Sequence, residues 1–220
     1  MTQQLYFLLL FLKCTATLLA YINDANWVLI RDGKYATPNT PFNEIVFDRH
    51  PIWQGRRLFN ASLALIYQGQ FVAYGQTGFS FNGQPSSDKI CAKFVDQSGE
   101  RAMHVCDNFR VLSNLVPNRK EFVLLKPEEL MGFDEKPNSQ ISLVRMSTAY
   151  AVLMLNPTTQ SSFFGSLKEV IKNPTYPELG VEKEAIGVDY DGSVVKYRGD
   201  WETSGQFIMF VAHYNRLLAK

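Results

Sequence analysis

The stretch Lys89–Phe109, KICAKFVDQSGERAMHVCDNF, constrains the fold more than any other, because it places two cysteines on either side of a small polar turn. Closed around the loop Gln97–Glu100, it predicts a β-hairpin in which Cys91 lies opposite Cys106. In that register the cysteines form a non-hydrogen-bonded pair, where side chains of antiparallel strands approach most closely. Because a disulfide needs a short Cβ separation, we predict a disulfide between Cys91 and Cys106. Gly99 supplies the positive φ that such a turn commonly needs.

The predicted disulfide indicates an oxidising compartment, since thiols in the cytosol are kept reduced. The same register places Lys93 opposite His104, which makes His104 the one nearby residue that could join the cysteines as a metal ligand. A single histidine is weak support for a metal site, so the sequence predicts a disulfide and no metal. We therefore expect a secreted or extracellular protein.

The N-terminal segment MTQQLYFLLLFLKCTATLLAY carries an apolar core from Leu5 to Leu12, followed by small residues. This core is shorter than the roughly 20 apolar residues of a membrane span, which favours a secretory signal peptide. No basic residue precedes the core, and Lys13 follows it directly, so an uncleaved N-terminal anchor or a buried first element remain alternatives. The sequence thus predicts a signal peptide or anchor over residues 1–20 and one β-rich domain over 21–220, with membrane attachment only if the segment is retained.

Charge and glycosylation signals add to this interpretation. Twenty-two basic and 21 acidic residues give a net charge of +1, without the basic excess by which nucleic-acid-binding proteins neutralise phosphates. Nucleic acid is therefore not an expected partner.

Asn60 begins the sequon Asn-Ala-Ser and is the candidate glycosylation site, whereas proline blocks the sequon at Asn156.

Segments with strand character dominate the chain, and the 16 Phe, ten Tyr and three Trp residues favour strands. In AIGVDYDGSVVKY, the Asp191-Gly192 dipeptide predicts a two-residue turn that sets Ile186 opposite Tyr197. The spacing of Phe163, Leu167, Val170 and Ile171 predicts a helix ended by Asn173-Pro174. Residues 127–131 predict a single helical turn, and the segment from Gln206 onward is ambiguous between strand and helix.

These elements predict a mainly β protein, an antiparallel sandwich or jelly-roll-like domain with one or two short helices. The alternative is a small β-propeller, because DANWVLIRDGKY (24–35) aligns without a gap with NASLALIYQGQF (60–71) at an offset of 36 residues. Repeats of about 40 residues are typical of propeller blades.

The sequence carries no nucleotide-binding glycine loop, no G-x-S-x-G motif and no H-E-x-x-H motif. No catalytic residue, metal ligand or cofactor is therefore predicted. The segment FDRHPIWQGRRLF gathers His50, Trp53, Arg56 and Arg57 around a proline and a glycine. Such a loop could stack on a sugar ring, hold an acidic group or anchor a protein partner; alternatively, Trp53 fills the core and the arginines are solvated.

Together these observations predict an exported binding or structural protein that recognises a glycan or protein surface, for example within an extracellular or virion assembly. We do not expect it to be an enzyme. The alternative is a secreted, glycosidase-like hydrolase whose carboxylates are brought together by folding.

Overall fold

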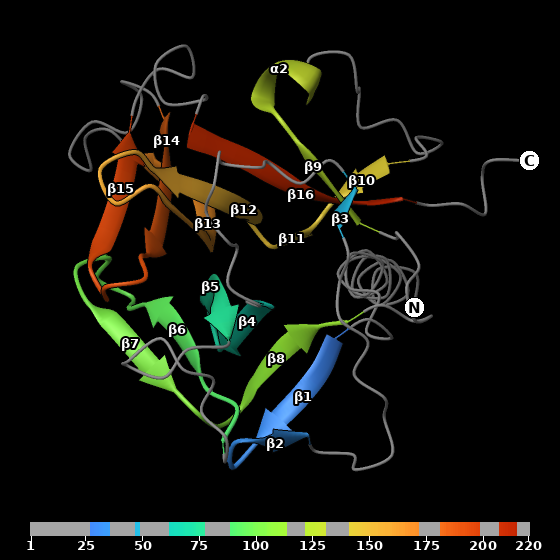
Figure 1. Ribbon diagram of the computed structural model, residues 1–220, viewed down its shortest axis with the longest axis vertical. Coiled ribbons are helices and arrows are strands. Elements are labelled where there is room, and N and C mark those ends of the chain that lie inside the picture. Colours follow the sequence, from blue (N-terminus) through green and yellow to red (C-terminus); the bar gives the residue numbers. More distant parts are fainter. Residues whose placement is uncertain are drawn as a thin grey trace, which may run out of the picture.

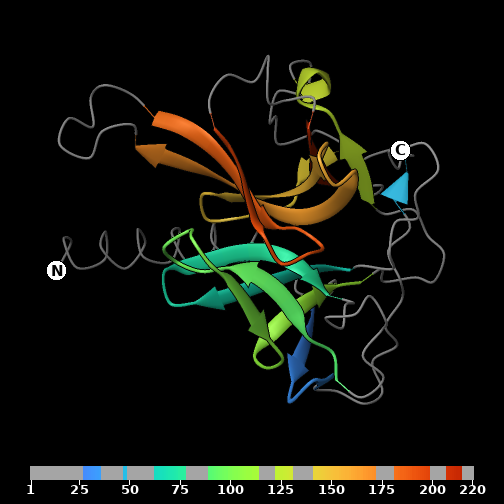
Figure 2. The same cartoon turned by 60° about the vertical axis from the view of Figure 1, so that its left-hand side comes forward.

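The computed structural model describes residues 27–35, 47–48, 62–77, 89–113, 122–130, 141–171, 181–198 and 207–214. Within them the chain forms two curled, almost wholly antiparallel sheets that pack against each other as a β-sandwich (Figures 1 and 2). The predicted mainly β sandwich is therefore confirmed. One helical turn, α2 (Pro127–Leu130), also falls where the sequence predicts one.

The first sheet has seven strands. Their spatial order is β2 (Lys34–Tyr35), β1 (Trp27–Arg31), β8 (Phe109–Leu112), β4 (Leu63–Gln68), β5 (Phe71–Thr77), β6 (Ala92–Val95) and β7 (Ala102–Val105). The second sheet has nine strands. Their order is β15 (Val194–Arg198), β14 (Val181–Val188), β13 (Ser161–Ile171), β12 (Ala149–Asn156), β16 (Ile208–Tyr214), β9 (Phe122–Leu125) and β3 (Phe47–Asp48), with β10 (Ile141–Leu143) beside β16 and β11 (Arg145–Met146) beside β12.

The two sheets share one topology. In the first, the strands β1-β8-β4-β5-β6-β7 lie side by side; in the second, β9-β16-β12-β13-β14-β15 lie in the corresponding order. In both sheets the strand that comes last in sequence, β8 or β16, lies between the first strand of the unit and the four strands that form its two hairpins. We call β1 with β4–β8 the N-terminal repeat, and β9 with β12–β16 the C-terminal repeat.

The strand registers agree with this duplication. Ala64 of β4 pairs with Gly75 on one side and Val111 on the other, and Val152 of β12 pairs in the same way with Gly165 and Phe210. The segments AKFVDQSG (92–99) and AIGVDYDG (185–192) occupy corresponding places and share Ala, Val, Asp and Gly at the same four positions. The described part of the chain thus contains two copies of one six-stranded arrangement.

Three of the five hydrophobic clusters among the described residues make up most of the core. Between the sheets lies a shared core to which both repeats contribute: Leu63, Leu65, Val72, Tyr74 and Leu112 from the first, and Phe122, Leu124, Ala149, Ala151, Leu153, Phe164, Met209 and Val211 from the second. A second cluster, which includes Ile30, Phe94 and Phe109, fills the curl of the first sheet. A third, which includes Met154 and Phe163, fills the curl of the second.

Two reciprocal hydrogen bonds cross between the repeats. The Tyr74 amide donates to Ser166 Oγ at 2.7 Å, and the Phe164 amide donates to Gln76 Oε1 at 3.3 Å. Tyr74 and Phe164 are counterparts in the two repeats, as are Gln76 and Ser166. The repeats are therefore related by an approximate two-fold axis that passes between β5 and β13.

Each repeat also places a hairpin turn against the other. Lys93 Nζ on β6 donates to the Tyr190 carbonyl in the β14–β15 turn at 3.2 Å. Conversely, Glu100 in the β6–β7 turn forms an ion pair with Lys196 on β15. Burial lowers the pKa of Lys93, and the nearby carboxylates of Asp191 and Asp189 oppose that shift. Both hairpins thus help to hold the repeats together.

The helix predicted from Phe163, Leu167, Val170 and Ile171 is wrong, because residues 161–171 form the longest strand, β13. Phe163 fills the curl of its sheet, whereas its neighbour Phe164 lies in the core between the sheets. A strand with both faces buried shows no simple alternation of apolar and polar residues. The spacing of the apolar residues in β13 therefore resembles the spacing on one face of an amphipathic helix.

Two further predictions need correction. In the β14–β15 hairpin Ile186 pairs with Lys196, one residue away from the predicted partner. The reason is a three-residue turn, in which the Asp189 amide donates to the Ser193 carbonyl and Gly192 takes the positive φ of +92°. The propeller alternative is also wrong: residues 27–35 and 63–71 are two hairpins of one sheet, not blades.

Candidate functional site: the disulfide hairpin

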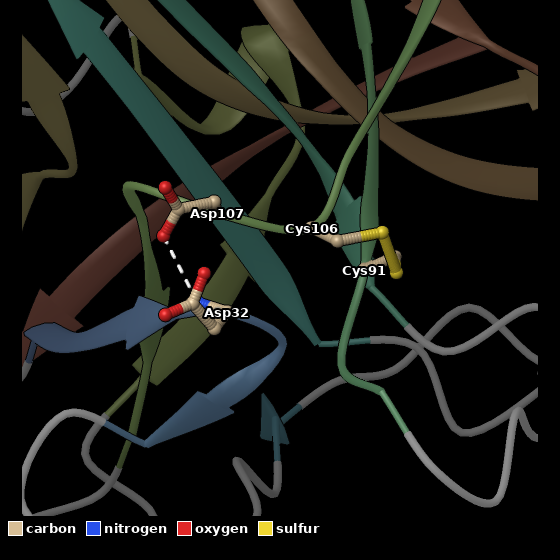
Figure 3. The surroundings of a disulfide bond; sticks show 4 residues. All are labelled: Asp32, Cys91, Cys106 and Asp107. Carbon is tan, nitrogen blue, oxygen red and sulfur yellow. Dashed lines mark hydrogen bonds between the residues drawn. A yellow bond between two sulfur atoms is a disulfide. The ribbon is translucent and has the colours of Figure 1, made fainter.

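The predicted disulfide hairpin is present in the predicted register. Strands β6 and β7 pair Lys93 with His104 and Phe94 with Met103. Just beyond the paired strands Cys91 and Cys106 form a disulfide, with their Cα atoms 4.0 Å apart (Figure 3). Both cysteines are half-buried. The disulfide prediction is confirmed.

The β6–β7 turn is organised by the carboxylate of Asp96. The backbone amide of Asp96 donates a hydrogen bond to the Arg101 carbonyl at 2.9 Å. Gly99 has the predicted positive φ, +78°. The Asp96 carboxylate accepts hydrogen bonds from the Ser98 hydroxyl at 2.8 Å and from the Glu100 amide at 3.0 Å. The Ser98 hydrogen bond is the main cause that lowers the pKa of Asp96. This fixed turn sets the alignment of the two cysteines.

The β1–β2 turn docks onto the disulfide end of this hairpin. The Gly33 amide donates to the Cys106 carbonyl at 2.6 Å, and the Ile90 amide donates to the Gly33 carbonyl at 2.8 Å. Gly33 has a φ of +73°, and a Cβ there would lie 2.7 Å from the Cβ of Lys89, so the position requires glycine. These contacts join the β1–β2 end of the first sheet to its β6–β7 end, so that the sheet closes around the cluster that includes Phe94 and Phe109. The disulfide therefore lies where the curl of that sheet closes.

A shallow polar hollow lies beside the closure. It measures about 310 Å³ and is lined by Arg31, Asp32, Asp107 and Asn108. The Asp32 amide donates to Asp107 Oδ1 at 2.9 Å, as Figure 3 shows. Asp32 and Asn108 both have positive φ, 49° and 52°. The hollow is open to solvent and exposes two carboxylates beside one guanidinium.

His104 lies on the same face of the hairpin as the disulfide. It precedes Cys106 by two residues on one strand, and side chains two apart on a strand point to the same side. A ligand atom of His104 and the two cysteine sulfurs all lie within 4.8 Å of one another. His104 is exposed. In the oxidised pair both sulfurs are committed to the disulfide.

A second polar cluster surrounds Asp189, which is fully buried. Its carboxylate accepts hydrogen bonds from Asn156 Nδ2 at 2.6 Å, Thr159 Oγ1 at 2.8 Å and the Tyr190 amide at 2.6 Å, and from the hydroxyl of Ser161. Each carboxylate oxygen accepts two of these bonds. The cluster ties the β12–β13 turn to the end of β14, and we assign it a structural role.

The other sequence-predicted site residues, His50, Trp53, Arg56 and Arg57, lie outside the described residues, as do Asn60 and the N-terminal segment 1–20. Sequence reasoning missed the contribution of Asp32, Gly33 and Asp107. The Asp32-Gly33 dipeptide signals a turn, but no local pattern could show that this turn docks beside the disulfide.

No protein-family model matches the chain, and no curated protein matches it. A search of solved structures finds the crystal structure of the nematode sperm cell motility protein MFP2B, with a TM-score of 0.51 and 13% sequence identity. The match covers 86% of this chain and 43% of that one, so this chain spans less than half of its structural neighbour. At this identity the likeness shows the fold alone. None of the helices in the described part of the chain has the length and hydrophobicity needed to cross a bilayer.

Proposed function

We propose that this protein is an exported binding or structural protein that works in an oxidising compartment and recognises a protein or glycan surface. The observation that carries the proposal is the Cys91–Cys106 disulfide. Structural disulfides persist in extracellular and other oxidising environments and are rare in the cytosol. Because both cysteines are only half-buried, a cytosolic reductant would have access to this bond.

The position of the disulfide supports a stabilising role in such a compartment. It closes a 15-residue separation, and a loop of that size contributes about 3 kcal/mol through the entropy of the unfolded chain. The Gly33 hydrogen bonds connect this hairpin to the β1–β2 turn. The crosslink therefore supports the whole first sheet as well as its own hairpin.

Two exposed aromatic side chains support a binding role. Among the described residues, the large hydrophobic side chains that lie most open to solvent are Tyr67, 53% exposed at the end of β4, and Tyr190, 40% exposed in the β14–β15 turn. Tyrosine is enriched among residues that dominate binding energy at protein interfaces. Together with the predicted loop around Trp53, these side chains are the first candidates for partner contact.

The hydrolase alternative remains a prediction with less support. Asp32 and Asp107 line one hollow, but this hollow is open to solvent. General acid catalysis by a carboxyl group at neutral pH needs an environment that keeps the group protonated, commonly by burial. The described hollow offers no such shielding.

The compartment is tested by the mass of the intact protein from its natural source, alkylated before and after reduction. We expect Cys91 and Cys106 to be alkylated only after reduction. A Cys91→Ser variant serves as the control, because it must expose Cys106 without reduction. If both cysteines of the natural protein are alkylated without reduction, the proposed export is wrong. The same measurement reports whether residues 1–20 are removed and whether Asn60 carries a glycan.

A further inference from the structure

The hairpin face that carries the disulfide also holds the donor set of a metal site. Cys91, His104 and Cys106 offer two sulfurs and one ring nitrogen, all within 4.8 Å of one another. Two features of the hairpin produce this grouping: the register sets the cysteines opposite each other, and the two-residue strand period places His104 on their side.

We propose that, when the disulfide is reduced, Cys91, Cys106 and His104 bind one Zn²⁺ ion, so that this hairpin alternates between a disulfide and a zinc site. The inference goes beyond the proposed function and does not rest on export.

The geometry requires only a small adjustment. Zinc binds thiolate sulfur at about 2.3 Å and imidazole nitrogen at about 2.0–2.1 Å, so two ligands of a tetrahedral ion lie about 3.3–3.8 Å apart. The three donor atoms, grouped within 4.8 Å, reach these separations through rotation of their side chains once the sulfurs part. The hydrogen bonds of the turn around Asp96 hold the two strands in register during that change. Three protein ligands leave the fourth position to water, as in zinc sites with two cysteines and one histidine.

The chemical balance needs one co-reactant, a dithiol reductant. It transfers two electrons and two protons to the Cys91–Cys106 disulfide, which becomes two thiols, and the reductant leaves as its own disulfide. Zn²⁺ then displaces the two thiol protons, which pass to solvent, and His104 coordinates as the neutral imidazole. Because disulfide and zinc use the same sulfurs, the two states exclude each other. The solvent-exposed edge of the hairpin gives both reductant and metal access: His104 is exposed and both cysteines are half-buried.

The test uses the full chain with Cys14→Ser, so that Cys91 and Cys106 are its only cysteines. The reduced protein is titrated with Zn²⁺ against a chromophoric chelator. We expect one Zn²⁺ per reduced chain and none per oxidised chain. His104→Ala should weaken zinc binding about 10- to 100-fold or more, since loss of even an indirect partner of a zinc ligand has an effect of that size. The matched control is His213→Ala, because His213 lies on β16 against Phe122 and should not affect zinc binding.

A thermal unfolding curve separates a folded site from thiols that bind zinc in an unfolded chain. Zinc that binds the folded state must raise the Tm of the reduced protein, and this rise should shrink in His104→Ala. If reduction itself unfolds the chain, zinc should restore a cooperative transition. The proposal is overturned if zinc leaves the Tm unchanged or lowers it, or if His104→Ala binds zinc as well as the parent.

Discussion

At the residue scale, two glycines show how closely the strands approach. Gly75 of β5 and Gly165 of β13 are counterparts in the two repeats. A Cβ on Gly75 would overlap the carbonyl oxygen of Lys93 on the next strand, and a Cβ on Gly165 would overlap the carbonyl oxygen of Ile186, the counterpart of Lys93. The obstacle is backbone in both cases, so no side-chain rotation can relieve it. The same constraint thus occurs in both halves of the molecule.

We therefore predict that Gly75→Ala and Gly165→Ala each destabilise the fold by about 3 kcal/mol or more, at the upper end of the range for overpacked cores. The matched control is Gly69→Ala, where nothing lies within 4 Å of the added methyl group and only the φ of +64° is unfavourable. Its cost should be about 1–2 kcal/mol. Urea unfolding measures all three. Equal midpoints for Gly75→Ala and Gly69→Ala would contradict the predicted backbone overlap.

At the element scale, the corresponding hairpins β6–β7 and β14–β15 use an aspartate at the same position, Asp96 and Asp189, in different ways. Asp96 is half-buried and stabilises its own turn, through Ser98 and Glu100. Its counterpart Asp189 is buried and accepts hydrogen bonds from Asn156 and Thr159 in the turn of a different hairpin. The shorter β14–β15 turn uses a second aspartate, Asp191, whose hydrogen bonds from Ser193 lower its pKa. Because Asp191 stabilises the β14–β15 turn, the Asp189 carboxylate is available to connect this hairpin to the β12–β13 hairpin.

From this difference we predict that Asp189→Ala destabilises the protein by about 3 kcal/mol or more, because it removes a buried carboxylate that accepts four hydrogen bonds. Asp96→Ala should have a clearly smaller effect, since water can replace the lost contacts. Guanidinium unfolding of both variants provides the comparison. If the two substitutions lowered stability equally, the structural role assigned to the buried cluster would be wrong.

The elements also show what sequence can reveal. The Cys91–Cys106 hairpin was predicted in the correct register because its turn and its cysteines all lie within 21 residues of sequence. Strand β13 was not predicted, because both of its faces are covered by elements distant in sequence. The internal repeat escaped detection for another reason. The spacing between counterparts changes along the chain, from Ala64 and Val152 to Val111 and Phe210, so no gapless comparison aligns the two units.

The same limit applies to the candidate site. The cysteines and His104 share one hairpin, so their proximity follows from local pattern alone. The hollow, by contrast, brings Asp32 of the β1–β2 turn to Asp107 after β7, which only the closure of the sheet can accomplish. The predicted binding loop with Trp53 lies outside the described residues and stays a prediction.

At the scale of the whole molecule, the approximate two-fold axis passes through the core that both repeats share. Each repeat curls around a cluster of its own, and its other face packs against its partner. The reciprocal hydrogen bonds from the Tyr74 and Phe164 amides cross the same interface. A separated repeat would expose that apolar face together with unpaired buried groups such as Gln76 and Ser166. Exposed apolar surface of this kind leads to association or loss of fixed packing.

We accordingly predict that residues 21–119 and 120–220, produced separately, each lack a cooperative unfolding transition, and that mixing them restores one. Near-ultraviolet circular dichroism follows the return of fixed packing around Tyr74 and Phe164, and urea unfolding measures its cooperativity. A Ser166→Ala change in the second fragment removes the acceptor for the Tyr74 amide, which should weaken the reassembled complex by about 1–3 kcal/mol. If either fragment alone unfolds cooperatively near the midpoint of the intact chain, the repeats are independent domains. The single-domain prediction for residues 21–220 would then be wrong, because the shared core would not be needed for folding.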